Sequence, residues 1–156
     1  MTQSKVRTCL WFNCEGEEAA RFYVSLIEGS EIETVSRPNP AGPALVVEFR
    51  LAGVPYMVLN GGPAFSHTPA ASISVLTRDQ DETDRLWSAL LDGGGHESRC
   101  GWLVDRFGVS WQIIPEALPR CMTSPDRAAA QRAQAAMMTM SKIDVAALEA
   151  AFNASA

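Results

Sequence analysis

The sequence predicts an α+β protein in which a strand–helix–three-strand unit (βαβββ) occurs twice in tandem, followed by a helical extension. Three observations lead to this fold class: a helix pattern that recurs at a fixed distance, a hairpin pattern that recurs after it, and a change of composition after Pro119. We therefore expect one module at residues 5–64, a second at 70–118, and the extension at 119–156.

Each predicted module opens with a short stretch rich in strand-forming residues. Residues 9–13 read Cys-Leu-Trp-Phe-Asn, and residues 73–77, which lie 64 positions later, read Ile-Ser-Val-Leu-Thr. Branched and aromatic side chains of this kind favour strands. We expect each stretch to form the first strand of its module.

The same distance separates two amphipathic helix patterns. Residues 18–29 and 82–93 share an acidic start, an arginine, two pairs of apolar residues and a terminal glycine. The apolar pairs lie four residues apart, which places them on one face of a helix. Gly29 and Gly93 stand where the end of a helix favours a positive φ.

Each module is predicted to end in a hairpin, after a second strand near Val35 or Glu97. Residues 51–60 and 106–115, 55 positions apart, both carry Gly-Val, then an aromatic residue, then an aliphatic run. This interval is shorter than that between the helices because the first module contains a Pro/Gly-rich loop at 37–43. Either module alone would expose a sheet face and a sheet edge, so we expect the two to pair.

Two short helices are predicted after Pro119. Ser124-Pro125-Asp126 indicates a helix start with Ser124 as the N-cap, and residues 141–144 indicate a second start. The apolar faces of these helices consist mainly of alanine and methionine, which makes neither helix stable alone. We expect them to dock on the modules or on a partner subunit.

Charge and composition argue against several classes of protein. The formal net charge of −5 and the lack of a basic stripe argue against nucleic-acid binding. No apolar run approaches the ~20 residues of a membrane span, and the first residues do not resemble a signal peptide. We therefore expect a cytoplasmic protein whose four cysteines (Cys9, Cys14, Cys100 and Cys121) are reduced.

Several stretches resemble the PhnB-like family, labelled 3-demethylubiquinone-9 3-methyltransferase, within the vicinal oxygen chelate superfamily of glyoxalase I, extradiol dioxygenases and bleomycin-resistance proteins. They are residues 10–12, 18–23, 59–63, 100–108, 110–113 and 142–148, so the resemblance extends over nearly the whole chain. It implies a glyoxalase-like fold in which the strands of two modules form a cupped mixed sheet around a cavity.

Metal-dependent members of that superfamily place ligands on the first and last strands of each module. The resemblance puts these positions at Thr8, Met57, Ser72 and Gln112. Hydroxyl, thioether and amide groups are poor ligands for manganese, iron, nickel or zinc. We therefore expect neither a metal nor another cofactor.

Alternation of side chains along the strands predicts what else lines the cup. If Thr8 and Ser72 face inward, then Leu10, Phe12 and Ser74 do so too. Trp102 is interpreted as core or, alternatively, as a stacking wall for a planar ligand. The predicted ligand-binding residues are Thr8, Met57, Ser72, Ser74, Trp102 and Gln112. Such a mixture is typical of a small-molecule pocket, and the alternative is that these side chains fill the cup completely.

Methyl transfer is not supported by the glycine patterns. Neither Gly61-Gly62 nor the run 93–95 lies in a strand–loop–helix unit of the nucleotide-binding type. We interpret the protein as a homodimer that binds an unidentified small molecule, and whether it catalyses a reaction stays open. The alternatives are a metal-dependent lyase or dioxygenase of the same fold and a non-enzymatic dimeric protein that sequesters its ligand.

Overall fold

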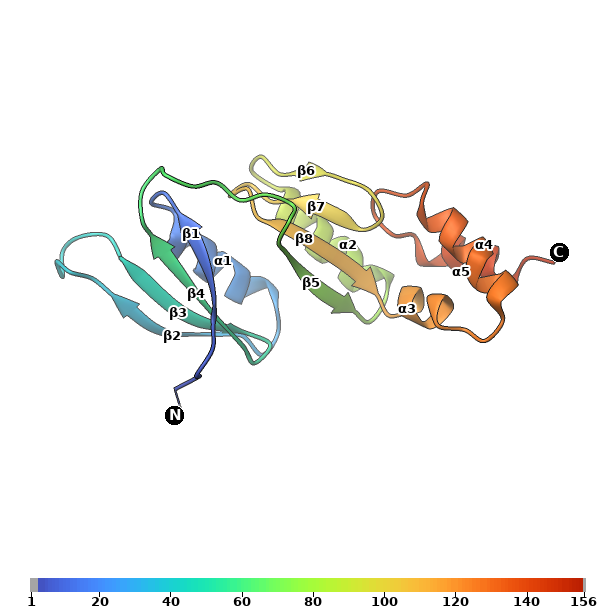
Figure 1. Ribbon diagram of the computed structural model, residues 1–156, viewed down its shortest axis with the longest axis horizontal. Coiled ribbons are helices and arrows are strands. Elements are labelled where there is room, and N and C mark those ends of the chain that lie inside the picture. The colour runs from blue at the N-terminus through green and yellow to red at the C-terminus, as the bar shows by residue number, and fades with distance from the viewer. Residues whose placement is uncertain (1–2, 156) are drawn as a thin grey trace. The chain divides into compact units, whose positions relative to one another are not determined.

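The computed structural model describes residues 3–155 and has the predicted order of elements in both modules (Figure 1). The first module contains β1 (Thr8–Phe12), α1 (Gly16–Leu26), β2 (Glu31–Ser36), β3 (Val46–Leu51) and β4 (Val54–Asn60). The second contains β5 (Ser72–Thr77), α2 (Gln80–Leu91), β6 (His96–Glu97), β7 (Trp102–Val104) and β8 (Ser110–Pro115). The helices α3 (Ala117–Met122), α4 (Arg127–Met137) and α5 (Val145–Asn153) follow. The predicted α+β class with tandem βαβββ modules is confirmed.

Each module forms its own four-stranded mixed sheet. The strand orders are β1-β4-β3-β2 and β5-β8-β7-β6, and in each sheet the first strand of the module runs parallel to the last. The remaining pairs are antiparallel. The chain divides into two compact units between His67 and Thr68, so each module, with its helices, is described by itself.

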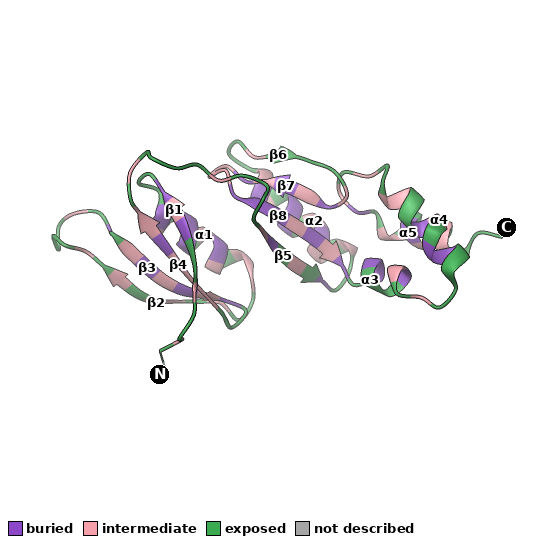
Figure 2. Cartoon of the chain, viewed as in Figure 1, coloured by how far each residue is buried: buried purple, intermediate pink, exposed green. Residues whose placement is uncertain are grey.

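One helix covers one face of each sheet. In the first module, Ala20 and Tyr23 of α1 and Val47, Phe49 and Val58 of the sheet are fully buried. The second module buries Leu86 and Leu90 of α2 together with Leu103, Trp111 and Ile113 in the same way. Figure 2 shows that buried and more exposed residues alternate along several strands. This alternation follows from the pleat, which sends successive side chains to opposite faces.

The glycines at the predicted helix ends have the expected backbone conformation. Gly29 has a φ of 74° and Gly93 a φ of 80°. Both helices end before these glycines, at Leu26 and Leu91, so the glycines lie in the turns that follow. None of the helices within residues 3–155 is long and apolar enough to cross a lipid bilayer.

The extension contains one helix more than predicted, and one N-cap differs. The helix α3 includes Pro119, whose missing N–H is tolerated because the first-turn amides of a helix have no intrahelical acceptor. The N-cap of α4 is Asp126, whose side chain accepts from Ala129 N at 3.0 Å. The prediction of Ser124 was wrong, since its hydroxyl instead accepts from Asp126 N at 3.2 Å.

Residues 140–145, which lead from the loop after α4 into the first residue of α5, join the extension to the second module. Cys100 N donates to Met140 O at 2.9 Å, and Gly101 N donates to Ser141 O at 2.8 Å. The amide of Gln80 donates to Ile143 O at 3.0 Å and accepts from Val145 N at 2.8 Å. The α4–α5 pair is therefore docked on the module by backbone as well as side-chain bonds.

A buried carboxylate organises the last hairpin of the second module. Asp105 is 2% exposed and accepts from Phe107 N at 2.8 Å, Val109 N at 3.0 Å and Trp111 Nε1 at 2.9 Å. Hydrogen bonds to a charged acceptor are stronger than neutral ones, and a buried charge needs them to offset its loss of water. Asp105 thus fixes both the turn and the indole of β8.

We expect Asp105→Asn to lower the free energy of unfolding by about 2–4 kcal/mol, because the amide removes the charge and turns its NH₂ group either toward the Trp111 indole N–H or toward the two backbone donors. Urea denaturation followed by circular dichroism measures this change. Asp92→Asn, at an exposed position, is the matched control, with an expected change below about 0.5 kcal/mol. Equal stability of the two variants would contradict the role given to Asp105.

Candidate functional site

The face of each sheet that no helix of its own module covers is the candidate site, and we call it the open face. In the second module, the strand register places Ser74 opposite Gln112, and Gln112 opposite Trp102. Directly opposed residues project from the same face. Ser72 lies two residues from Ser74 and so shares this face. The structure therefore brings together four of the six predicted site residues.

The polar groups of this open face are linked to each other. The Nε2 of Gln112 donates to Ser72 Oγ at 2.9 Å. Trp102 and Gln112 are half-buried, whereas Ser74 is exposed. Leu76, two residues beyond Ser74, is 58% exposed, and it is paired with Ile114. The open face of the second module thus combines hydroxyl, amide and indole groups with an apolar end.

In the first module only one of the two predicted residues lies on the open face. Met57 is opposite Cys9, and Leu59 is opposite Trp11. Thr8 is instead opposite Tyr56, whose ring stacks on the buried ring of Phe49 with centroids 5.6 Å apart.

The placement of Thr8, Leu10 and Phe12 in the cup was wrong. Leu10 and Phe12 are buried, and Leu10 is paired with Val58, which packs near Gly16 of α1. These two side chains therefore lie beneath the helix, and Thr8, two residues before Leu10, belongs to the same face.

The physical reason is one additional residue between strand and helix. Three residues, 13–15, separate β1 from α1, whereas two residues, 78–79, separate β5 from α2. Phe12 therefore corresponds to Thr77, because each ends its strand and is paired with the last residue of the parallel strand, Asn60 or Pro115. A shift of one residue exchanges the two faces of a strand.

The open face of the first module also carries a charged network that the sequence reasoning missed. Arg7 lies 2.5 Å from a carboxylate oxygen of Glu33 and 3.5 Å from one of Glu48, and Arg50 lies 2.8 Å from the other Glu33 oxygen. The side chains of Arg7 and Glu33 are both 9% exposed. Thr34 Oγ1 donates to Glu48 at 2.9 Å. The alternation of Val-Val-Glu-Phe-Arg-Leu along β3 is the signal that could have revealed this network.

Glu33 is held in its charged form by this network. Its hydrogen bond from Arg50, followed by the hydrogen bond and charge of Arg7, lowers the pKa of the carboxyl group, although burial acts in the opposite direction.

An aromatic pair lies at the other end of the first module's sheet. The Trp11 ring meets Phe65 edge to face with centroids 5.0 Å apart, and its Nε1 donates to Gly62 O at 2.9 Å. Phe65 is itself 67% exposed. The open face of this module therefore changes from charged to apolar along the strands.

The donors present do not fit a transition-metal site within either unit. Within residues 3–155, no group of three His, Cys, Asp or Glu side chains lies close enough together to hold an ion. Serine, methionine and glutamine side chains do not replace such a set. Glu48 has a carboxylate, which is a usable metal ligand, but this group already accepts a hydrogen bond from Thr34 and forms an ion pair with Arg7.

Comparison with protein families gives one match. Residues 4–114 match the model of the family described as 3-demethylubiquinone-9 3-methyltransferase. The match ends before residues 142–148, so it does not include the C-terminal stretch on which the expected resemblance also relied. A comparison with curated proteins gives no match.

Solved structures match about three quarters of the chain. A PhnB protein from Bacillus cereus is 32% identical with a TM-score of 0.65, and the match covers 72% of this chain and 99% of that one. Protein PA1353 from Pseudomonas aeruginosa is 23% identical with a TM-score of 0.60, covering 73% and 98%. The fosfomycin resistance protein FosX from Mesorhizobium loti is 11% identical with a TM-score of 0.53, covering 73% and 92%, and this likeness is one of fold.

We expect Glu33→Gln to lower the free energy of unfolding at pH 7 by about 1–3 kcal/mol, because it leaves two arginines without their shared carboxylate. The lowered pKa means that this stabilisation is present above the unfolded-state pKa of about 4.3 and is lost as the pH falls through the folded-state pKa.

The measurement is urea denaturation of both proteins between pH 3 and pH 7. The difference between them should shrink as the pH falls below about 4. Glu31→Gln, an exposed position on the same strand, is the control and should track the unsubstituted protein throughout. A difference that is independent of pH would contradict the role assigned to the charge of Glu33.

Proposed function

Because the chain belongs to the 3-demethylubiquinone-9 3-methyltransferase family and has the vicinal oxygen chelate fold, we propose that it binds a small organic molecule on the open faces of its sheets without a metal. The observation that carries this proposal is the row Ser74, Gln112 and Trp102, which lies across one uncovered face. Small-molecule sites are typically apolar surfaces with a few fixed polar groups.

The row supplies complementary contacts for a planar ligand. Gln112 Nε2 is held by Ser72, which orients the amide and leaves its carbonyl oxygen as an acceptor. The Trp102 indole offers a flat surface for stacking. Leu76, which is exposed beside Ile114, supplies apolar area beyond the polar row, whereas Ile114 itself packs against the buried cluster of the extension. We therefore propose a ligand with one planar apolar part and at least one hydrogen-bond donor.

The same side chains favour binding over acid–base catalysis. Ser72, Ser74, Trp102 and Gln112 carry no group that titrates near neutral pH, as a general acid or base would require. Methyl transfer from S-adenosylmethionine is not part of the proposal, because residues 13–15 and 78–79, which connect the first strand of each module to its helix, contain no glycine. A binding or sequestering role is therefore our first choice.

We also propose that the protein is a homodimer. Leu76 and Phe65, both large and apolar, are more than half exposed. Exposed apolar area of this kind is typical of an interaction surface. A second copy of the chain would offer the same surfaces for burial, as symmetric dimers do.

A thermal-shift screen of small metabolites tests the binding proposal. A ligand present at 100 times its Kd stabilises the folded state by about 2.7 kcal/mol, which raises the melting temperature. We expect Ser74→Val to remove this shift for the best compound. Thr8→Val is the matched control, because Thr8 is also an exposed hydroxyl residue on a first strand but lies on the opposite face, and it should keep the shift.

Loss of the shift in both variants, or in neither, would contradict the proposed site. The same assay with Mn²⁺ or Zn²⁺ alone distinguishes this proposal from the metal-dependent alternative, since we expect no rise in melting temperature with either ion. A clear rise that chelation reverses would favour a metal-dependent enzyme of the same fold.

Light scattering at micromolar protein concentration tests the dimer. We expect a mass twice that of one chain, and we expect Leu76→Glu to shift the population toward single chains, because a buried unpaired charge opposes association. Ser25→Glu, an exposed position on α1, serves as the control and should leave the dimer intact. A mass of one chain for the unsubstituted protein would contradict the proposal.

A further inference from the structure

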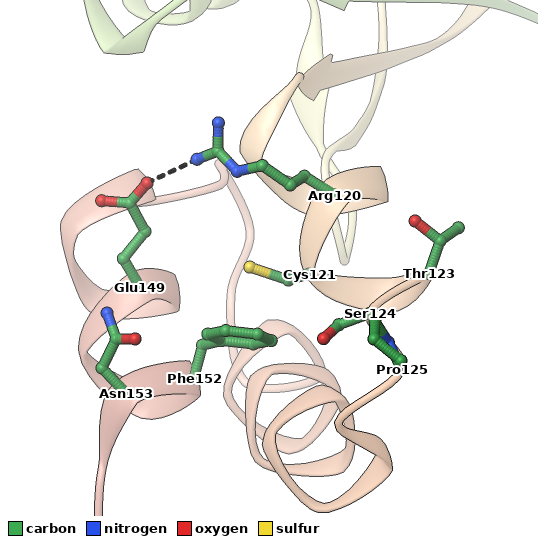
Figure 3. Close-up of a pocket in the computed structure, with 8 residues that line it drawn as sticks. All are labelled: Arg120, Cys121, Thr123, Ser124, Pro125, Glu149, Phe152 and Asn153. Atoms are coloured by element: carbon green, nitrogen blue, oxygen red, sulfur yellow. Dashed lines mark hydrogen bonds and ion pairs between the residues drawn. The ribbon is translucent and has the colours of Figure 1, made fainter.

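The C-terminal helices enclose a pocket that the family resemblance does not explain. The pocket has a volume of about 460 Å³ and lies between the end of α3, the turn that follows it, and the last turns of α5 (Figure 3). The family match ends at residue 114, before any of these elements. Its volume lies in the range of sites for small organic molecules.

The interior of the pocket is largely apolar. Cys121 is 3% exposed and belongs to the buried cluster around Leu118 and Leu148, against which Phe152 packs. Figure 3 shows Cys121 above the ring of Phe152, with Glu149 on one side and Pro125 on the other. Burial raises the pKa of the Cys121 thiol, so the thiol is neutral near pH 7 and acts as an apolar contact.

The rim carries one positive and one negative charge. Arg120 donates to Glu149 at 2.8 Å, and the two side chains are 67% and 44% exposed. Among residues 3–155 this pair is the one ionic contact of either side chain, so further guanidinium N–H groups and a carboxylate oxygen remain available. The Asn153 amide lies next to Glu149 on the same rim (Figure 3).

We propose that this pocket binds a free α-amino acid with an apolar side chain. The α-carboxylate is held by Arg120 and the α-ammonium group by Glu149, while the side chain enters between Phe152, Cys121 and Pro125. Guanidinium and carboxylate groups are strong partners for these two charges.

The charge of the rim selects a zwitterion over other small molecules. A ligand with only a carboxylate would bring a negative charge beside Glu149, and a ligand with only an ammonium group would bring a positive charge beside Arg120. A zwitterion offers its carboxylate to Arg120 and its ammonium group to Glu149, so that each charge of the ligand meets an opposite charge of the rim. The apolar interior, in turn, disfavours an amino acid with a charged side chain.

Titration of the full chain with L-phenylalanine, followed by ¹H–¹⁵N NMR, tests the proposal. Resonances of residues 120–125 and 149–153 should shift. The half-molecules 3-phenylpropanoate and phenethylamine are the comparison probes, and each should bind about tenfold more weakly, because each lacks one charged contact.

Two rim variants give opposite results for the half-molecules. Arg120→Gln and Glu149→Gln should each weaken phenylalanine binding by about three- to tenfold. Glu149→Gln should strengthen 3-phenylpropanoate binding, because it removes the like charge, and Arg120→Gln should strengthen phenethylamine binding for the same reason. A merely structural role of the pair would not produce this reversal.

Arg78→Gln is the matched control. Arg78 forms a partly exposed ion pair with Glu82, at 3.1 Å, in the same unit, and neither residue lines the pocket, so its loss should leave phenylalanine affinity unchanged. The proposal is overturned if phenylalanine shifts no resonance of the pocket, or if 3-phenylpropanoate binds as tightly as phenylalanine and is unaffected by Glu149→Gln.

Discussion

The structure depends on the constraint that a single helix is available to cover each four-stranded sheet. In both modules the first and last strands are parallel, and α1 or α2 leaves the first strand and packs on one face only. Val47, Phe49 and Val58 are buried beneath α1, whereas Leu76 on the uncovered face of the other sheet remains 58% exposed. The candidate site and the proposed dimer both follow from the face that has no helix.

The internal repeat was sufficient to predict the fold class, because a duplicated pattern of apolar residues specifies the same elements twice. It was not sufficient to orient β1. The helices correspond at a distance of 64 residues, but the strands before them correspond at 65, since the connection of residues 13–15 is one residue longer than its counterpart. The hydrophobic pattern of the sequence does not reveal this difference of one residue, because Cys-Leu-Trp-Phe is apolar on both faces of the strand. The difference nevertheless decides whether Thr8 or Cys9 lies beside Met57.

In the second module the orientation expected for β5 matches the observed strand register, because the side chains of this strand alternate clearly. Ser72 and Ser74 are polar and Ile73 and Val75 apolar, so only one orientation buries the right side chains beneath α2. The charged network of the first module joins β2 and β3 to Arg7, which precedes β1, and no single segment of sequence contains these residues together. The N-cap of α4 was missed for a local reason, since Ser124 and Asp126 are both good caps and only the backbone decides between them.

The bonds that residues 140–145 make with Gln80 and with the backbone at 100–101 determine which parts of the chain unfold together. Gly101 is packed so closely that an added Cβ would lie 2.9 Å from Ile113 O and 3.2 Å from Ile143, so the extension and β8 meet at a position without spare room. Breaking this contact would expose Ile143 and the ends of α2 and β7 together. The extension and the second module should therefore behave as a single cooperative foldon whose amide protons exchange together.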